Sequence, residues 1–430
     1  DSNYWVGAYI RVHVSGNRVS VRKIKSYNPD NHTVNFDDLG SDPLEFEGKY
    51  HYAVSGKVNL ISSPGEFAID EEYMRIYVWP YDNPEKIRIS VRPYGIHLNQ
   101  QSFIIIENLI FEGQSGTINN FGSIIDASTG KSQQGIIIRD CEARNINAKE
   151  TSGGIYNFNS NNVSYYTIIE NNYLHHIQGR GITVIGDLFK INANKLRFIT
   201  GTGILMQRCN SGEIADNDID QCAGTHSNGI SIYNGSSNVI IKNNKIMNFR
   251  SKTGPYAITH SDSHRLIFYN NIIDGKFYGW GPNEGCEFLR FFNNTITGLS
   301  YIASANRCSE ISWVNNITAG IDKNSMTVHK YNLYTDWFWT QRSDWQLGEG
   351  EIYYPDKNAI FLNYLNGDFR LKPGSPAINA GVDLSSYFTT DKDGISRPQG
   401  SAWDIGAYEY LEAGQPDTTP PAPPRNLRVE

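Results

Sequence analysis

The chain has 430 residues, of which 12% are aromatic and 19% are charged, a composition that excludes a disordered or collagen-like chain. The formal net charge of −7 gives no indication of a nucleic-acid partner. No run of about 20 apolar residues occurs, so no membrane-spanning helix is predicted.

Residues 1–100 show the two-residue alternation of apolar and polar side chains that is typical of β-strands. The alternation is clearest in Arg11–Val14 and in Val19–Ile24. We therefore predict a β-rich N-terminal unit over residues 1–100. Because a stack of strands leaves unpaired groups at its first edge, this unit is predicted to be a cap or an insertion.

From residue 103 onward a phrase of apolar residues ending in asparagine recurs, and its last positions form a ladder. The shortest steps of this ladder match one coil of a parallel β-helix, and the longer steps indicate coils with inserted loops. An apolar residue stands three positions before each ladder position, which predicts a continuous core inside the stacked coils. Asparagine side chains inside such a turn can hydrogen-bond to the coils above and below. The ladder positions are Asn108, Cys141, Asn172, Asn194, Asn217, Asn244, Asn271, Asn294 and Asn316.

A second series follows the first in several coils, and each of its members pairs a small residue with isoleucine. It comprises Gly154-Ile155, Gly181-Ile182, Gly203-Ile204, Gly229-Ile230 and Ala257-Ile258. The asparagine ladder and this second series recur together along the chain. Together they predict an all-β fold, a right-handed parallel β-helix over residues 101–320. The phrase order resembles pectate-lyase-like β-helix proteins. The resemblance implies that the second series forms the floor of a substrate groove.

Segments at both ends of the repeat carry further resemblances. Ser63–Asp70 followed by Ile76–Pro80 is similar to a segment found in secreted glycoside hydrolases of families 120 and 141, although Phe67 stands where those proteins usually have tryptophan. Gly374–Gly381 and Asp404–Tyr410 resemble the closing segment of bacterial secreted β-helix proteins, so residues 321–415 are predicted to close the helix. Residues 416–430 begin with a proline-rich linker, and residues 425–429 resemble the first strand of a fibronectin type III module.

Cysteine usage fits an extracytoplasmic protein. Cys286 and Cys308 are separated by one short repeat and fall at corresponding positions of adjacent coils. We predict that they are stacked, and a disulfide between them would agree with a secreted or cell-surface location. No CxxC pair occurs, so neither a zinc site nor a redox motif is predicted.

The candidate chemistry lies in the coils with long insertions, because inserted loops build the walls of a groove. A glycoside hydrolase needs two carboxyl groups beside the scissile bond. Asp262 and Glu284 are also separated by one short repeat and could occupy the same turn of adjacent coils. The alternative interpretation is that both are ordinary acidic residues of solvent-exposed turns.

A polysaccharide lyase or a C5-epimerase instead needs a base for the proton α to a uronate carboxylate, and a cation that neutralises this carboxylate. His226 or Tyr233 could act as base or acid. Arg180, Arg208 or Arg250 could neutralise the charge, or could simply be basic surface residues.

The remaining candidates would hold the substrate. Asn228, Tyr256 and Trp280 are predicted to bind substrate. Tyr233 and Tyr156 fall on the outward phase and either stack on sugar rings, whose C–H faces suit aromatic surfaces, or are ordinary surface aromatic residues. His260 falls on the inward phase and is predicted to be a hydrogen-bonded core histidine.

We expect a monomeric, secreted polysaccharide-cleaving enzyme that uses no cofactor and no metal, with hydrolysis ahead of elimination or epimerisation. A non-catalytic glycan-binding or adhesive module is the alternative class.

Overall fold

The computed structural model divides the chain into two compact units, residues 1–90 and 91–430. No helix in the part of the chain that the structure describes is long and apolar enough to cross a membrane. The described residues are 3–15, 18–38, 52–70, 73–83, 85, 92, 94–98, 101–114, 125–126, 133–147, 153–156, 164–222, 224, 227–249, 256–279, 286–302, 308–322, 327–336 and 346–412.

The N-terminal unit is an antiparallel sheet followed by a separate hairpin. The sheet has the order β3-β2-β1-β4, and Ile10, Val12 and Ile24 form its small core. In the hairpin the carboxylate of Glu66 accepts hydrogen bonds from the backbone N–H groups of Ser62 and Ser63. The elements are β1 (Tyr9–Ser15), β2 (Arg18–Asn28), β3 (Thr33–Phe36), β4 (Tyr52–Ser55), the 3₁₀ turn η1 (Val58–Leu60), β5 (Phe67–Asp70) and β6 (Arg75–Val78).

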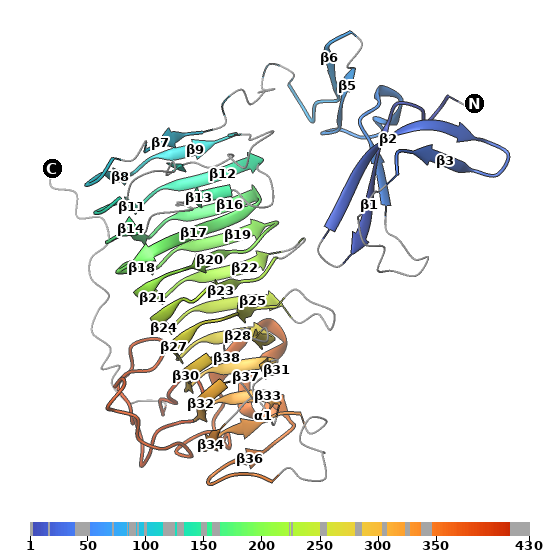
Figure 1. Cartoon of the computed structure of the whole chain (residues 1–430). Helices are drawn as coiled ribbons and strands as arrows, with labels where there is room; N and C mark the ends of the chain where they lie inside the picture. The colour runs from blue at the N-terminus through green and yellow to red at the C-terminus, as the bar shows by residue number, and fades with distance from the viewer. Residues whose placement is uncertain are drawn as a thin grey trace. The chain divides into compact units, whose positions relative to one another are not determined.

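The second unit is a parallel β-helix whose coils each contribute strands to up to three faces, which confirms the predicted fold class. Figure 1 shows its strands stacked from β7 and β8 at one end to β34 and β36 at the other. The first face is a 10-stranded parallel sheet. It comprises β8 (Ile105–Glu107), β11 (Ile137–Arg139), β15 (Ile168–Glu170), β18 (Phe189–Asn192), β21 (Asn210–Ala215), β24 (Ser237–Lys242), β27 (His264–Tyr269), β30 (Cys286–Phe292), β32 (Cys308–Val314) and β34 (Val328–Lys330).

The second and third faces follow in each coil, and β31 (Thr295–Ile302) runs through both. The second face also comprises β9 (Ile110–Glu112), β12 (Glu142–Asn147), β16 (Tyr173–Gln178), β19 (Lys195–Ile199), β22 (Asp218–Cys222), β25 (Lys245–Phe249), β28 (Ile272–Gly275), β33 (Ile317–Ile321), β35 (Leu333–Tyr334) and β36 (Ile352–Tyr353). The third face also comprises β7 (Ile96–His97), β10 (Ile125–Asp126), β13 (Gly153–Tyr156), β17 (Arg180–Asp187), β20 (Ile204–Gln207), β23 (Ile230–Tyr233), β26 (Ile258–His260) and β29 (Phe277–Gly279), and the short β14 (Ser164–Tyr165) pairs with the end of β17.

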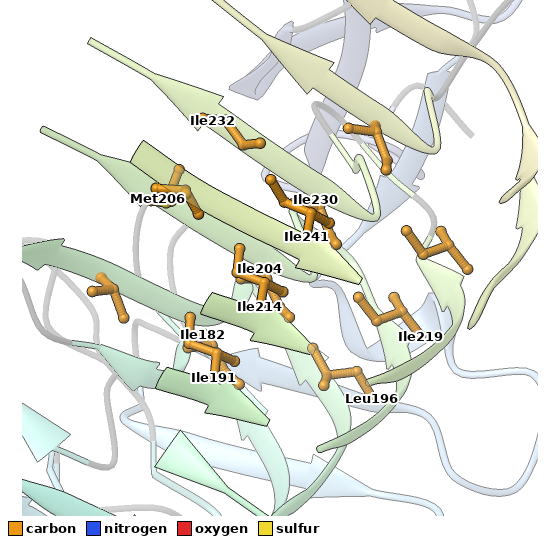
Figure 2. Close-up of a cluster of buried hydrophobic side chains, with 14 of the residues drawn as sticks. Ile182, Ile191, Leu196, Ile204, Met206, Ile214, Ile219, Ile230, Ile232 and Ile241 are labelled. Atoms are coloured by element: carbon orange, nitrogen blue, oxygen red, sulfur yellow. The ribbon is translucent and has the colours of Figure 1, made fainter. Parts of the chain in front are cut away.

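Inward side chains of equal position lie on top of one another from coil to coil and form one long core. Figure 2 shows two of these stacks, in which Ile182, Ile204 and Ile230 come from the third face and Ile191, Ile214 and Ile241 from the first. In later coils the first-face stack becomes aromatic. Phe268 and Phe291 are 4.8 Å apart between ring centroids, and Phe291 and Trp313 are 3.7 Å apart. These rings are fully buried, so the core stays filled as the side chains grow larger.

The asparagine ladder is present at the turn between the first and second faces. The side-chain amide of each ladder residue donates to the carbonyl oxygen of the next, as from Asn217 to Asn244 at 2.9 Å and from Asn244 to Asn271 at 3.0 Å. The first predicted ladder position, Asn108, was wrong by one residue. Arg139 pairs with Glu107, which places Leu109 opposite Cys141. The ladder also extends one coil further than predicted, to Asn332.

A buried glutamate ends the ladder. Asn332 donates to Glu351 Oε1 at 2.8 Å, and Tyr334 donates to the same oxygen at 2.7 Å. His329 Nδ1 and the backbone N–H of Gly348 bond to Oε2. Burial raises the pKa of Glu351, but the hydrogen bonds outweigh it and hold the pKa below its ordinary value. The last ladder amide therefore meets a charged acceptor instead of an open end.

The C-terminal segment lies against the outside of the helix in the later coils. Outward positions of the second face that are charged in earlier coils, such as Asp218 and Lys245, become apolar at Ile272, Ile317 and Leu333. These pack against the C-terminal segment in a second core. Its elements are the helical turn α1 (Lys357–Ile360), β37 (Phe361–Asn363), the 3₁₀ turn η5 (Tyr364–Asn366) and β38 (Asp368–Leu371).

Asparagines that precede the ladder residues hold this segment in place. Asn270, Asn293 and Asn315 have positive φ angles between 49° and 58°. Their side-chain amides donate to backbone carbonyls of the segment between residues 382 and 406. Within the segment, Arg397 forms an ion pair of 2.7 Å with Glu409, and both side chains are fully buried. The hydrogen bonds from these three asparagines therefore attach the C-terminal segment to the late coils.

The predicted cysteine pair is bonded. Cys286 and Cys308 are in register on β30 and β32, and their Cα atoms are 4.4 Å apart. Cys141, Cys209 and Cys222 are free and buried. Burial raises the pKa of the Cys209 and Cys222 thiols to about 12.

Glycines of the second series lie where the third face begins close to the second. A Cβ atom on Gly203 would lie 2.7 Å from the carbonyl oxygen of Gly229 and 3.1 Å from Ile219. One on Gly181 would lie 2.5 Å from the carbonyl oxygen of Gly203. Packing at this corner therefore requires glycine at these two positions.

Candidate functional site

The outer surface of the third face is the site that the sequence predicts. One outward column crosses it in strict register and is made of hydroxyl-bearing and aromatic residues with one leucine. Its first four members are buried, whereas Tyr278 and Tyr301 are half-buried. The column is Thr183, Leu205, Ser231, Thr259, Tyr278 and Tyr301.

A hydrogen-bonded cluster forms around Thr259 and brings together two of the predicted residues. The hydroxyl of Tyr233 lies 2.7 Å from Thr259 Oγ1. The side-chain amide of Asn228 donates to Ser231 Oγ at 3.1 Å and to Thr259 Oγ1 at 3.3 Å. The backbone N–H of Tyr256 donates to Asn228 Oδ1 at 3.2 Å. These bonds fix the position of the Tyr233 hydroxyl from two neighbouring coils.

Three tyrosines are stacked next to this cluster. Tyr256 and Tyr278 lie 4.6 Å apart between ring centroids with an interplanar angle of 21°, and Tyr278 and Tyr301 lie 5.3 Å apart. Burial, with smaller contributions from the other two rings, raises the pKa of Tyr278 above its ordinary value. The tyrosines therefore form an aromatic row that runs from coil to coil.

Lys276 is a residue of this region that the sequence interpretation missed. It lies opposite Ala257, at the column that holds glycine in earlier coils. It is half-buried, and burial lowers its pKa. A charged residue in a column of glycine and alanine was the signal that could have identified it.

The predicted charged residues lie at the two edges of the third face. Arg180 is the first residue of β17, whereas Arg208 and Asp262 follow the ends of β20 and β26. Arg208 and Asp262 both have positive φ angles, 49° and 48°, and occupy the same corner two coils apart. Ser261 Oγ lies 3.1 Å from Asp262 Oδ2, while Asp262 Oδ1 is buried without a hydrogen-bond partner in the described part of the chain. Because Arg180 begins a third-face strand and Arg208 follows the end of another, the two arginines lie at opposite edges of this face.

Four predicted site residues, His226, Arg250, Trp280 and Glu284, lie outside the described residues. The pairing of Asp262 with Glu284 stays a prediction for this reason. The inward placement of His260 is confirmed: its side chain is fully buried in the column of Met206 and Ile232. Within the described ranges, however, neither ring nitrogen has the expected hydrogen-bond partner. Burial lowers the pKa of His260 to about 4.

No cluster of three or more histidine, cysteine, aspartate or glutamate side chains among the described residues has the geometry of a metal site. Asp218 and Asp220 lie on β22 of the second face and approach Arg197. These acids are therefore part of a different surface from the third face.

Comparisons with known proteins concern the helix region. Residues 162–324 match the family model described as a right handed beta helix region. Among solved structures, pectate lyase Pel9A is similar with 14% sequence identity and a TM-score of 0.35, covering 72% of this chain and 83% of that chain. No protein with curated annotation matches. The region 162–324 is thus a right-handed parallel β-helix.

Proposed function

We propose that this protein acts on a polysaccharide that lies along the outer surface of the third face. The accessible part of this surface includes four half-buried tyrosines, Tyr233, Tyr256, Tyr278 and Tyr301. Hydroxyl and amide groups lie beside them. Sugar rings present C–H faces to aromatic rings and hydroxyls to polar groups, so this combination suits a glycan.

The chemistry that the described residues support best is abstraction of the proton α to a uronate carboxylate, the step common to lyases and C5-epimerases. The observation that carries this proposal is the 2.7 Å hydrogen bond between Tyr233 and Thr259, which orients the phenol as acid or base. Arg208 lies at the same edge, and its backbone N–H donates to the carbonyl oxygen of Tyr233. Its guanidinium would neutralise the uronate carboxylate. Lys276, whose pKa burial lowers, is a second candidate base.

Glycoside hydrolysis is the second candidate. It is favoured by the buried Asp262 Oδ1, which has no hydrogen-bond partner within the described ranges. A buried carboxylate oxygen without a partner carries a desolvation cost, which a hydrogen bond from a substrate hydroxyl would relieve. Glu284 would supply the second carboxyl group. The similarity of residues 63–80 to glycoside hydrolases of families 120 and 141 also supports this candidate.

A panel of uronate-containing and neutral polysaccharides would separate the two. Elimination gives an unsaturated uronate that absorbs near 232 nm, epimerisation in D₂O incorporates deuterium at C5, and hydrolysis gives reducing ends alone. We expect absorbance or deuterium incorporation, with a loss of roughly 100-fold or more in kcat for Tyr233→Phe and little change for Asp262→Asn. The exposed Tyr166, which lies at the end of the third face in an earlier coil, changed to phenylalanine, is the matched control.

The opposite pattern, reducing ends that vanish in Asp262→Asn but persist in Tyr233→Phe, would reject elimination and support hydrolysis. Binding without any reaction would reject both and identify a glycan-binding module. A location outside the cytoplasm is part of the proposal, because disulfides such as Cys286–Cys308 persist in oxidising compartments. Thiol titration of the unfolded protein should then find three free cysteines of five.

A further inference from the structure

The second face carries a group of aromatic side chains that the proposed reaction does not use. His175 is stacked on Tyr173 with ring centroids 4.3 Å apart, and His176 is stacked on Phe198 at 4.7 Å. The Nδ1 atoms of the two histidines lie 2.8 Å apart. Glu142 holds His175 from the preceding coil through a 3.0 Å contact. We call Tyr173, His175, His176 and Phe198 the aromatic platform.

The platform is open to solvent although its backbone is unfavourable for large side chains. Tyr173 and Phe198 are 37% and 47% exposed. His176 and Phe198 have φ angles of 53° and 54°, in the left-handed region that bulky residues rarely adopt. Their column holds Asn145, Gln221 and Asn248 in the other coils. The two aromatic residues of the column thus stand side by side in adjacent coils, with their rings stacked on each other.

A polar cleft of about 600 Å³ adjoins the platform on the same face. Arg197, the residue before Phe198, lines this cleft together with residues 365–367 of the C-terminal segment. Gly367 has a φ angle of 74°, and a Cβ atom there would lie 2.5 Å from Met247 Cε. The cleft is therefore built by two parts of the chain that are far apart in sequence.

The charges of the cleft largely neutralise one another. Its lining includes two cations, Arg197 and Lys245, and three carboxylates, Asp218, Asp220 and Asp274, so the carboxylates are in slight excess. Arg197 forms an ion pair with Asp218 and lies 3.9 Å from Asp220. An anionic ligand would meet net repulsion here, and a cation would have to compete with Arg197. Hydroxyl groups, which both donate to carboxylates and accept from guanidinium and ammonium groups, suit this lining.

We propose that the second face is a separate glycan-binding surface that takes neutral sugar residues. One sugar ring packs against the exposed ring of Phe198, because Tyr173 is already covered by His175 and by the ammonium group of Lys195, and the next sugar places its hydroxyls in the cleft. The cleft has the volume of typical small-molecule sites. This surface is distinct from the third face, so its binding does not depend on the reaction proposed there.

Affinity gel electrophoresis with galactan, xylan and glucomannan, and with polygalacturonate as the anionic comparison, would test this. We expect at least one neutral polysaccharide to retard the protein, and Phe198→Asn and Asp220→Asn each to weaken retardation by about fivefold. Asparagine already occupies the column of Phe198 at Asn248, so Phe198→Asn should not impair folding. Tyr166→Asn, which removes an exposed aromatic ring with a φ angle of 57° at another corner, is the matched control.

Equal retardation of wild type, Phe198→Asn and Asp220→Asn would overturn the proposal, as would absence of retardation by every neutral polysaccharide. Stronger retardation by polygalacturonate that Phe198→Asn abolishes would also overturn it, because the predicted ligand is uncharged. The same variants should keep full activity on short uronate oligosaccharides. If that activity is absent in wild type while retardation still depends on Phe198, the reaction proposal fails and the second-face proposal stands.

Discussion

Replacing one ladder asparagine should cost a large part of the stability of the helix. The side chain of Asn244 is fully buried. Its oxygen accepts from the backbone and side-chain nitrogens of Asn217, and its nitrogen donates to the carbonyl oxygen of Ile214 and to Asn271 Oδ1. At about 1 kcal/mol for each of these four bonds, with the buried N–H of Asn217 left unpaired, Asn244→Ala should lower the free energy of unfolding by about 4–6 kcal/mol.

Urea unfolding followed by circular dichroism and by tryptophan fluorescence would measure this loss. Both probes are needed, because stacked coils can unfold in parts and then no single free energy is defined. The adjacent Asn243 has a φ angle of 54°, so Asn243→Gly keeps the backbone geometry and should change stability by less than about 1 kcal/mol. A loss for Asn244→Ala no greater than that of Asn243→Gly would refute the reasoning, since it would mean that ladder bonds are worth no more than bonds to water.

Three further changes test other parts of the fold. Reducing the Cys286–Cys308 bond, which links positions with a sequence separation of 22, should lower stability by about 3 kcal/mol, measured as the urea midpoint with and without reductant; an unchanged midpoint in Cys286→Ser would contradict this. The pKa of Glu351 is lowered in the folded state, so its stabilisation is present above its unfolded pKa of about 4.3 and is lost as the pH falls through the folded value. Glu351→Gln should therefore be less stable than wild type by about 2 kcal/mol at pH 7, a difference that narrows below pH 4 in a pH series of urea midpoints. Burial lowers the pKa of His260 from 6.5 to about 4, so the wild type should lose up to about 3 kcal/mol as the pH falls from 6.5 to 4. His260→Met should remove most of this dependence, and an identical pH slope in the variant would contradict the assignment.

The coil architecture could be predicted from the sequence because the ladder and the second series repeat in phase. The error at Asn108 has a physical origin. Many coils carry two consecutive asparagines, such as Asn171 and Asn172, of which the first has a positive φ angle and faces outward while the second enters the ladder. Both positions favour asparagine for different reasons, one conformational and one by hydrogen bonding. Only the strand register, which places Asn108 in the outer position, distinguishes them.

The candidate site could be predicted only in part. Alternation placed Tyr233 on the outer surface of the third face, where it bonds to Thr259. The partner itself could not be identified, because loops of different length separate consecutive coils and the pairing of side chains depends on the resulting register. The cleft of the second face was equally hidden, since Leu365–Gly367 and Arg197 line it together although several coils separate them along the sequence.

The outer asparagines have a consequence for how the helix comes apart. A stack in which each coil contacts only its neighbours can fray from its ends, one coil at a time. Asn270, Asn293 and Asn315 belong to three successive coils, yet all three donate to the same C-terminal segment. Loss of any one of these coils would strip contacts from that segment and so weaken its hold on the other two. The C-terminal segment thus links the last coils to one another, and these coils should open as a single cooperative block instead of one at a time.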